Sequence, residues 1–347
     1  MIKNTLLLLL LFVNYEVFCQ NNFHRDTTVI VNENGVLFKN AWAGGLNSTQ
    51  FNDIDLDLDG KKDLIVFDKS GDKILPYLNK NGQFVFAPDY RQSFPDLHDW
   101  VILADYNCDG KNDIYTYSTG GVAIYENTST TSLSFNLVTN LVLSDYGGPN
   151  PINIYISAVD VPAVSDVDYD GDLDILTFKI TGGFIEFHKN LAMETIGSCD
   201  TILFELSESC WGNFYEGLNN YTLNCQNCQC PPIINHPNAK QKHAGSTLLL
   251  IDIDNDYDKD IVLGDISFSN LNLLINGGDS TSANMIMVDS MFPQNNSNTI
   301  AANLEIFPAA YYLDLTNDGI KDLIVTSNSE NNSENFTSCW LFNNSGS

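Results

Sequence analysis

One short acidic pattern occurs five times in this chain of 347 residues and constrains its fold more than any other feature. Each copy has Asp at positions 1, 5 and 9, an acid, amide or hydroxyl residue at position 3, and Leu or Ile at position 10. Four of the five copies have Gly at position 6. The copies begin at Asp55, Asp105, Asp166, Asp252 and Asp314. Repetition of one loop indicates an internal repeat, so we expect one structural unit for each loop.

A second marker follows each loop: a short apolar or aromatic run that ends in Asn. These runs end at Asn79, Asn127, Asn190, Asn276 and Asn343. Short stretches rich in β-branched and aromatic residues lie on both sides of each loop, as at residues 101–103 and 64–67. Such stretches, bounded by Gly, Asn and Asp, are typical of β-strands. The mature chain has no sustained 3.6-residue apolar period, so the repeat predicts strands and not helices.

The spacing of the loops indicates the kind of β fold. Successive loops start 50, 61, 86 and 62 residues apart. That is the length of one four-stranded propeller blade with its turns, whereas a β-helix would need shorter repeats. We therefore predict an all-β fold, a β-propeller of four-stranded blades, with about five to six blades' worth of sequence present. The longest interval carries an insertion at about residues 192–244.

The chemistry of the loop favours a metal ion. Side chains at positions 1, 3 and 5 of a tightly turned loop converge on one point, and Asp at position 9 closes the cage. All the donors are hard oxygens, which suit Ca²⁺ better than a softer transition metal. The start matches an EF-hand loop, but Glu at position 12 is missing and strands flank the loop. The predicted metal ligands are Asp55, Asp57, Asp59, Asp63, Asp105, Asn107, Asp109, Asp113, Asp166, Asp168, Asp170, Asp174, Asp252, Asp254, Asp256, Asp260, Asp314, Thr316, Asp318 and Asp322.

Ordinary solvated turns also favour Asp, Asn and Gly, and they would explain a single copy of the loop. Five copies at blade spacing favour several calcium sites instead. The sites are unequal: Tyr257 replaces Gly in the fourth loop, although Asp258 adds a carboxylate, while Asn107 and Thr316 reduce the charge of the second and fifth. We expect the first and third loops to bind calcium most strongly and the fifth most weakly.

The charge of the chain excludes one class of partner. The formal net charge is −28, and 18 of the 44 acids occupy positions 1, 3, 5 and 9 of the loops. Such a chain cannot neutralise a phosphate backbone, so we expect no nucleic-acid binding, and attraction to an anionic lipid surface is disfavoured. Because the acids repel one another without a cation, the value of −28 describes the metal-free chain.

The N-terminus has the features of an export signal. Lys3 precedes an unbroken apolar run at residues 6–13, which is too short to span a bilayer. Cleavage after Cys19 would leave Gln20 as the new N-terminus; the alternative, lipidation of Cys19, is disfavoured by the bulky Phe18 before it. We therefore expect a signal peptide at residues 1–19, an exported propeller over residues 20–347, and no transmembrane segment.

The acidic loops resemble the calcium loops of FG-GAP and VCBS repeats, the units of integrin-α-like β-propellers. Wider stretches are similar to exported propeller proteins of Gram-negative bacteria that use type IX secretion; they begin at Trp42, Asp105, Cys210, Leu263 and Phe307. The resemblance implies a seven-bladed propeller, extracellular or outer-surface placement and a sorting domain at the far C-terminus. Since the sequence stops at Ser347, soon after Asn343, we expect it to be a fragment of a longer protein.

The cysteines agree with export. Seven lie after residue 19: Cys108, Cys199, Cys210, Cys225, Cys228, Cys230 and Cys339. Five of these fall in the insertion, where Cys225, Cys228 and Cys230 with His236 and His243 could form a zinc site. In an exported protein a disulfide-stapled insertion is the better interpretation. The odd number leaves one thiol without a partner inside the chain, and the pairing cannot be deduced from the sequence.

Little in the sequence supports catalysis. It contains no His-Glu-x-x-His, Gly-x-Ser-x-Gly, P-loop or dinucleotide motif. Pairs of acids are so abundant that nominating a glycosidase pair carries little information. We expect a monomeric calcium-binding module that binds an extracellular protein or glycan, and not an enzyme. A carbohydrate-active propeller enzyme and a passive scaffold within a longer secreted protein are the alternatives.

Overall fold

The computed structural model describes residues 26, 28–218, 220–230, 245–294, 298–333 and 337–346. The chain separates into two compact units, Met1–Trp42 and Ala43–Ser347. In the first unit, β1 (Asn32–Glu33) and β2 (Val36–Leu37) form an antiparallel hairpin, and the indole N–H of Trp42 donates to the carbonyl of Val29 at 2.8 Å. The predicted signal peptide and its cleavage site lie outside the described residues.

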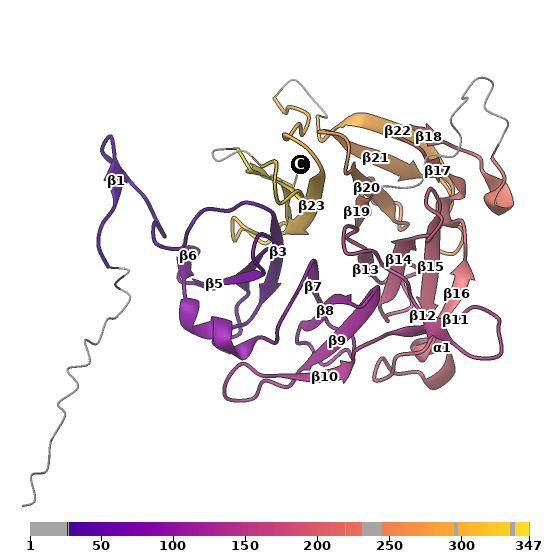
Figure 1. Cartoon of the computed structure of the whole chain (residues 1–347), viewed down its shortest axis with the longest axis horizontal. Helices are drawn as coiled ribbons and strands as arrows, with labels where there is room; N and C mark the ends of the chain where they lie inside the picture. The colour runs from indigo at the N-terminus through magenta and orange to yellow at the C-terminus, as the bar shows by residue number, and fades with distance from the viewer. Residues whose placement is uncertain are drawn as a thin grey trace, which may run out of the picture. The chain divides into compact units, whose positions relative to one another are not determined.

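The second unit is a β-propeller of five blades, which confirms the predicted fold class (Figure 1). Blades 1, 2 and 4 are four-stranded antiparallel sheets whose strands follow one another in sequence. Blade 1 consists of β3 (Thr49–Ile54), β4 (Asp63–Asp68), β5 (Lys73–Asn79) and β6 (Phe84–Phe86). Blade 2 consists of β7 (Val101–Ala104), β8 (Asp113–Ser118), β9 (Gly121–Asn127) and β10 (Phe135–Thr139). Blade 4 consists of β19 (Ser246–Ile251), β20 (Asp260–Asp265), β21 (Leu271–Asn276) and β22 (Met285–Phe292).

Blades 3 and 5 depart from the four-stranded form. Blade 3 contains β13 (Ala163–Ser165), β14 (Asp174–Phe178), β15 (Ile185–Asn190) and β16 (Phe204–Glu208), extended at its outer edge by β11 (Leu143–Asp145) and β12 (Ile152–Asn153). Blade 5 has three strands, β23 (Pro308–Leu313), β24 (Asp322–Ser327) and β25 (Cys339–Phe342). The short remaining elements are η1 (Pro88–Ser93), α1 (Ala192–Ile196), η2 (Trp211–Asn213), β17 (Tyr215–Glu216), β18 (Tyr221–Thr222) and η3 (Gln226–Cys228).

The core lies between the faces of neighbouring blades. Ile65 of β4 and Ile114 of β8 belong to one buried apolar cluster, because the second strand of each blade is covered on both faces. Four other clusters join the remaining neighbours in the same way, and the last contains Val66 of blade 1 and Ile324 of blade 5. Apolar side chains of adjacent sheets therefore pack face to face around the whole ring.

Direct contacts between blades 1 and 5 close the ring at five blades. The hydroxyl of Thr326 donates to the carbonyl of Thr49 at 2.6 Å, and that of Ser338 donates to the carbonyl of Leu46 at 2.9 Å. Asn47 Nδ2 donates to the carbonyl of Glu330 at 2.9 Å. The seven blades implied by the family resemblance are thus not the arrangement of the described residues.

The cysteines of the insertion form disulfides, as predicted. Cys210 pairs with Cys228 and Cys225 with Cys230, while Cys199 reaches back to Cys108 in blade 2. The alternative zinc site loses its three thiols to these bonds; His236 and His243 lie outside the described residues. Among the cysteines of the described residues, Cys339 in blade 5 is the one free thiol.

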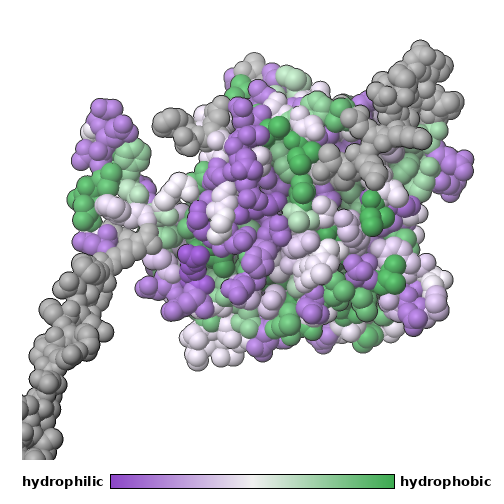
Figure 2. Space-filling view, in the orientation of Figure 1, coloured by the Kyte–Doolittle hydropathy of each residue, from purple (hydrophilic) through white to green (hydrophobic). Residues whose placement is uncertain are grey.

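On the face seen in Figure 2, hydrophobic residues form patches scattered among hydrophilic ones. In the described part of the chain, no helix has the length and apolar character needed to cross a membrane.

Candidate metal centres

The five acidic loops occupy equivalent places in the five blades. Each one joins the innermost strand of its blade to the next strand outward, as residues 55–62 join β3 to β4. We number them loop 1 to loop 5 in chain order. Because neighbouring inner strands run in the same direction, as the parallel bridge between Val161 and Thr247 shows, all five loops lie at the same end of the ring.

The loops are tightly turned at two positions. Position 6 has a left-handed backbone in every loop, with φ of 84° at Gly60 and 69° at Tyr257, so loop 4 keeps the predicted turn without glycine. Position 4 is also left-handed in all five loops, although none has glycine there. The position-4 residues are Leu58, Cys108, Tyr169, Asn255 and Asn317. Five non-glycine residues in this sparsely populated region indicate strain that the loop as a whole maintains.

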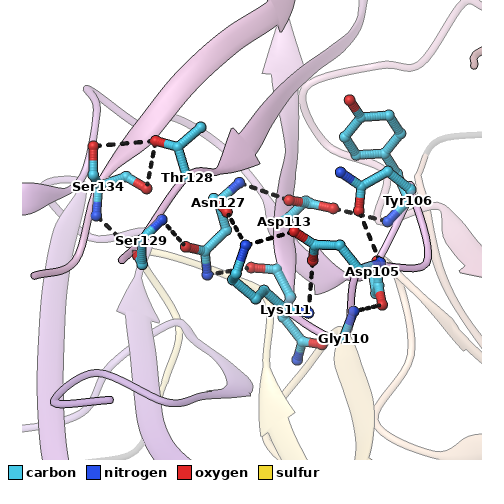
Figure 3. Close-up of polar contacts among 12 residues, drawn as sticks. Asp105, Tyr106, Gly110, Lys111, Asp113, Asn127, Thr128, Ser129 and Ser134 are labelled. Atoms are coloured by element: carbon cyan, nitrogen blue, oxygen red, sulfur yellow. Dashed lines mark hydrogen bonds and ion pairs between the residues drawn. The ribbon is translucent and has the colours of Figure 1, made fainter. Parts of the chain in front are cut away.

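The Asp at position 1 organises the turn. In loop 2, Asp105 accepts hydrogen bonds from the backbone N–H groups of Asp109 at 3.1 Å and Gly110 at 2.7 Å (Figure 3). Loops 1, 4 and 5 repeat this pattern. These bonds are internal to the loop, so position 1 has a structural role whether or not a metal ion is bound.

The Asp at position 9 connects the loop to the third strand of the blade. In loop 2, Asp113 Oδ1 accepts from the backbone N–H of Asn127 at 2.6 Å, and its Oδ2 accepts from that of Tyr106 at 2.9 Å (Figure 3). The same pair of bonds occurs in every blade. In blade 5 the donor is Asn344, one residue beyond the marker expected at Asn343.

The structure brings predicted ligands together in three of the loops. Carboxylate oxygens lie within 4.8 Å of one another in loops 1, 3 and 4. These clusters are Asp55, Asp57 and Asp63; Asp166, Asp168 and Asp174; and Asp252, Asp254 and Asp260. Loops 2 and 5 form no such cluster of three acids among the described residues, in agreement with Asn107 and Thr316 at their third positions.

Loop 3 contains a further cluster that the repeat pattern does not reveal. Asp168 and Asp170 meet Glu194, which lies on α1 in the insertion. The same helix covers Asp172 at position 7, whose Oδ2 accepts from the backbone N–H of Met193 at 2.9 Å. Glu194 has no fixed spacing from the loop, so only the folded insertion identifies it as a candidate ligand.

Buried carboxylate oxygens without hydrogen-bond partners are concentrated in these loops. In loop 4, both oxygens of Asp258 at position 7 are buried and unpartnered, and the residue is 1% exposed. In loop 3, each of four acids has one buried oxygen without a hydrogen-bond partner. In loop 1, Asp57 Oδ1 is an oxygen of the same kind. The four acids of loop 3 are Asp166, Asp168, Asp170 and Asp172. Buried charged oxygens are unfavourable unless they are paired or coordinate a metal ion, and an all-oxygen set of this kind fits Ca²⁺.

Lysines already contact some of these acids. In loop 1, Lys61 Nζ lies 2.8 Å from Asp59 and Lys80 Nζ 2.5 Å from Asp57. In loop 3, Lys189 pairs with Asp168 and Glu194 and lies 3.5 Å from Asp170 Oδ2. Loop 2 has a similar pair between Lys111 and Asp109. The described residues contain no ion pair between a lysine and an acid of loop 4, and the charge of Lys259 attracts Asp252 only from a longer distance.

Burial raises the pKa of several loop carboxyls. It raises the pKa of Asp174 to about 8, of Asp170 to about 7 and of Asp113 to about 6. In loop 4 burial raises the pKa of Asp258 to about 7, and neighbouring acids, Asp256 first, add to the shift. Both causes penalise the charged form, and a bound divalent cation would favour it.

One stretch of the chain matches a known family model. Residues 55–116 match the FG-GAP-like repeat model, over a span that begins with loop 1 and ends in β8. No curated protein sequence matches the chain. Among solved structures, the chain is similar to an Agrocybe aegerita lectin described as recognising non-reducing terminal N-acetylglucosamine, with 15% identity, 86% of each chain covered and a TM-score of 0.40.

The chain is also similar to the Photorhabdus luminescens Tc holotoxin pore, with 12% identity and a TM-score of 0.39. That match covers 87% of this chain but only 14% of the toxin chain. The chain is therefore a five-bladed β-propeller, of which residues 55–116 match the FG-GAP-like repeat model.

Proposed function

We propose that the protein is an extracellular, calcium-binding β-propeller that serves as a binding module for a protein or a glycan. The observation that carries the calcium assignment is the set of buried, unpartnered carboxylate oxygens in loops 1, 3 and 4. A solvated turn would expose these oxygens to water, whereas both oxygens of Asp258 are buried. Calcium would supply the missing partner and would remove the repulsion within each loop.

The disulfides support placement outside the cytoplasm. Three disulfides form within the described residues, and bonds of this kind persist in oxidising compartments. Two of them hold the insertion, and the third joins loop 2 to the segment after α1. A rigid ring whose loops gather at one end presents a stable surface there, which suits binding of a partner.

One buried contact bears on the enzyme alternative. Ser144 Oγ lies 2.9 Å from His188 Nδ1, which resembles a nucleophile with its base. Both side chains are fully buried inside blade 3, and Tyr146 packs edge-on against the histidine ring. A substrate cannot reach this pair, so it supports the packing of the blade and not catalysis.

A calcium titration of the purified protein tests the proposal. Calorimetry in calcium, magnesium and chelator should show binding of calcium and a higher melting temperature with calcium than with chelator. Sites of extracellular modules typically bind with dissociation constants of about 10⁻⁴–10⁻³ M, so the titration should extend well into the millimolar range. Identical melting curves in all three conditions would reject the calcium assignment.

A substitution in loop 4 tests whether this loop is one of the calcium-binding sites. Asp258→Asn removes a buried charge without a counter-ion, so it should raise the melting temperature in chelator and reduce the further increase caused by calcium. The matched control is Asp96→Asn, an exposed aspartate outside the loops, which should change neither value. An equal calcium increment in wild type and Asp258→Asn would remove loop 4 from the binding sites.

A further inference from the structure

The centre of the ring contains a pocket of about 510 Å³, within the usual size range of small-molecule sites. All five inner strands contribute to its wall, for example through Asn52 of β3, Val164 of β13 and Leu249 of β19. We call it the central pocket. Its lining also includes Lys62, Asn112 and Lys321, which lie at position 8 of loops 1, 2 and 5, so the pocket is located at the loop end of the ring.

A short segment of the chain crosses the opposite end of the ring. Lys69 of blade 1 donates from Nζ to the carbonyl of Ala158 at 3.1 Å, and Asn328 of blade 5 donates from Nδ2 to the carbonyl of Val159 at 3.2 Å. Two side chains from neighbouring blades therefore hold the Ala158–Val159 segment across that end. Access to the central pocket is then from the loop end.

The wall of the central pocket is rich in backbone donors and acceptors. Each inner strand is the end strand of its sheet, so one of its edges has no partner within the sheet and faces the centre of the ring. The bridge between Val161 and Thr247 occupies part of the β19 edge. Asn52 uses part of the β7 edge, because its side chain donates to the carbonyl of Val101 and accepts from the N–H of Leu103. Alternating N–H and C=O groups along such edges match the hydroxyl groups of a sugar, which both donate and accept.

The rim of the central pocket is locally cationic, although the chain is strongly acidic. The carboxylate in the lining of the pocket is that of Asp53. Its Oδ1 forms an ion pair with Lys62 Nζ at 3.2 Å and accepts a hydrogen bond from Asn112 Nδ2 at 2.9 Å. Lys321 lies with Nζ 5.7 Å from the centre of the Tyr312 ring and forms no ion pair with a described acid. Its ammonium group is therefore available to an incoming anion.

A third lysine lies beside this rim. Lys259, at position 8 of loop 4, is attracted by the charges of Asp166 and Asp252 and, less strongly, repelled by that of Lys321. Its Nζ lies 4.0 Å from the centre of the Tyr169 ring. The same loop position thus carries lysine in loops 1, 4 and 5. Calcium in the neighbouring loops would cancel part of their negative charge, so the field at the rim becomes more favourable to an anion when calcium is bound.

We propose that the central pocket binds the carboxylate-bearing residue of an acidic saccharide, with the carboxylate against Lys62 and Lys321 and the hydroxyl groups against the strand edges. The proposal rests on the glycan-binding part of the proposed function and assigns it a place and a ligand class. It also links the two kinds of site, because calcium in the loops should strengthen binding of the saccharide.

The test uses a short oligosaccharide of galacturonic acid as the probe, titrated calorimetrically into the full chain in the presence of calcium. Neutral galactose oligosaccharide and succinate serve as comparison ligands that lack the carboxylate or the sugar. Lys62→Gln with Lys321→Gln should weaken binding of the galacturonate by about ten-fold or more, because charge-assisted contacts are lost. Lys73→Gln, an exposed lysine of blade 1 outside the central pocket, is the matched control.

Three results would overturn the proposal: no binding of galacturonate by wild type with calcium, undiminished binding by the double variant, or equal binding of a comparison ligand. A calcium titration of the same samples separates the two proposals. If calcium binds and galacturonate does not, the pocket assignment fails alone. If galacturonate binds equally well with calcium and with chelator, the link between the sites is wrong.

Discussion

The backbone N–H of Asn190 donates to Asp174 Oδ1 at 2.9 Å, and this bond joins β15 to the end of loop 3. Asp174 Oδ2 accepts from the N–H of Val167 at 2.9 Å, so one buried carboxyl fixes both the loop and the third strand. The two repeated markers in the sequence, the acidic loop and the Asn, are therefore the two ends of one structural connection. Position 9 thus serves the fold as well as the candidate metal site.

Substitutions in loop 3 should separate these two roles. Asp174→Ala leaves two buried N–H groups without an acceptor, at about 1–3 kcal/mol for each. It should therefore lower the free energy of unfolding in chelator as well as in calcium. Asp170→Ala should lower it mainly in calcium, because Asp170 Oδ2 has no hydrogen-bond partner and only a 3.5 Å ion pair with Lys189. Denaturant unfolding in the two conditions measures both effects, and equal losses for Asp170→Ala in each would remove it from the metal ligands.

The raised pKa values predict the pH dependence of the calcium-free protein. Burial raises the pKa of Asp174 to about 8 and of Asp258 to about 7, from 3.8. The folded state then binds protons that the unfolded state releases, so stability in chelator should decrease as the pH rises from about 4 to about 8. Thermal unfolding across this range checks the sign; stability that increases over the whole range would contradict it.

Calcium binding should also release protons near neutral pH. The ion favours the charged form of carboxyls such as Asp258, which burial keeps partly protonated at pH 6.5. Calorimetric titration in two buffers of different ionisation enthalpy measures the number of protons released. Asp258→Asn should reduce that number, whereas Asp96→Asn should leave it unchanged.

Lys189 should compete with a metal ion in loop 3. Its ammonium group contacts Asp168 and Glu194 and occupies the space between acids that would otherwise hold a cation. Lys189→Gln should destabilise the protein in chelator and should strengthen calcium binding at this loop. Calorimetry and melting curves test the two opposite effects, with Lys73→Gln as the control. Weaker calcium binding by Lys189→Gln would show that the lysine supports the site.

The disulfide between Cys108 and Cys199 should stabilise the loop end of the ring. It closes a long stretch of chain, with a separation of 91 residues, and links position 4 of loop 2 to the segment after α1. Replacing both cysteines with Ser should lower the free energy of unfolding by about 2–4 kcal/mol. Cys339→Ser, which removes the free thiol, is the comparison and should have a smaller effect. An unchanged denaturant midpoint for the double variant would show that this disulfide does not contribute to the free energy of unfolding.

The sequence predicts the repeat unit well because its signals are local. The turn at Gly60, the apolar strands around it and the Asp at position 9 all lie within one short stretch of chain, so their spacing is visible without a structure. The density of cysteines is enough to predict disulfides in the insertion. The pairing of Cys199 with Cys108 cannot be predicted in this way, because it depends on how blades 2 and 3 meet.

Other parts of the candidate sites depend on the folded ring. Glu194 and Lys189 reach loop 3 from outside the repeat pattern, and the burial of Asp258 results from packing around loop 4. The expected ranking placed loops 1 and 3 first, by composition. The structure adds that no lysine among the described residues forms an ion pair with an acid of loop 4. The closure at five blades likewise depends on the apolar cluster that includes Val66 and Ile324, which no local pattern contains.

That closure changes how the molecule can open. An open array of repeats can fray from either terminal repeat, because each of those has a neighbour on one side only. In this ring the bond from Ser338 to Leu46 and the packing of blade 5 against blade 1 give every blade two neighbours. The first event of unfolding must then open one of the five interfaces between blades, after which the blades behave as a linear array. Amide hydrogen exchange in β3 and β23 should therefore report the cooperative opening of the whole ring and not local fraying.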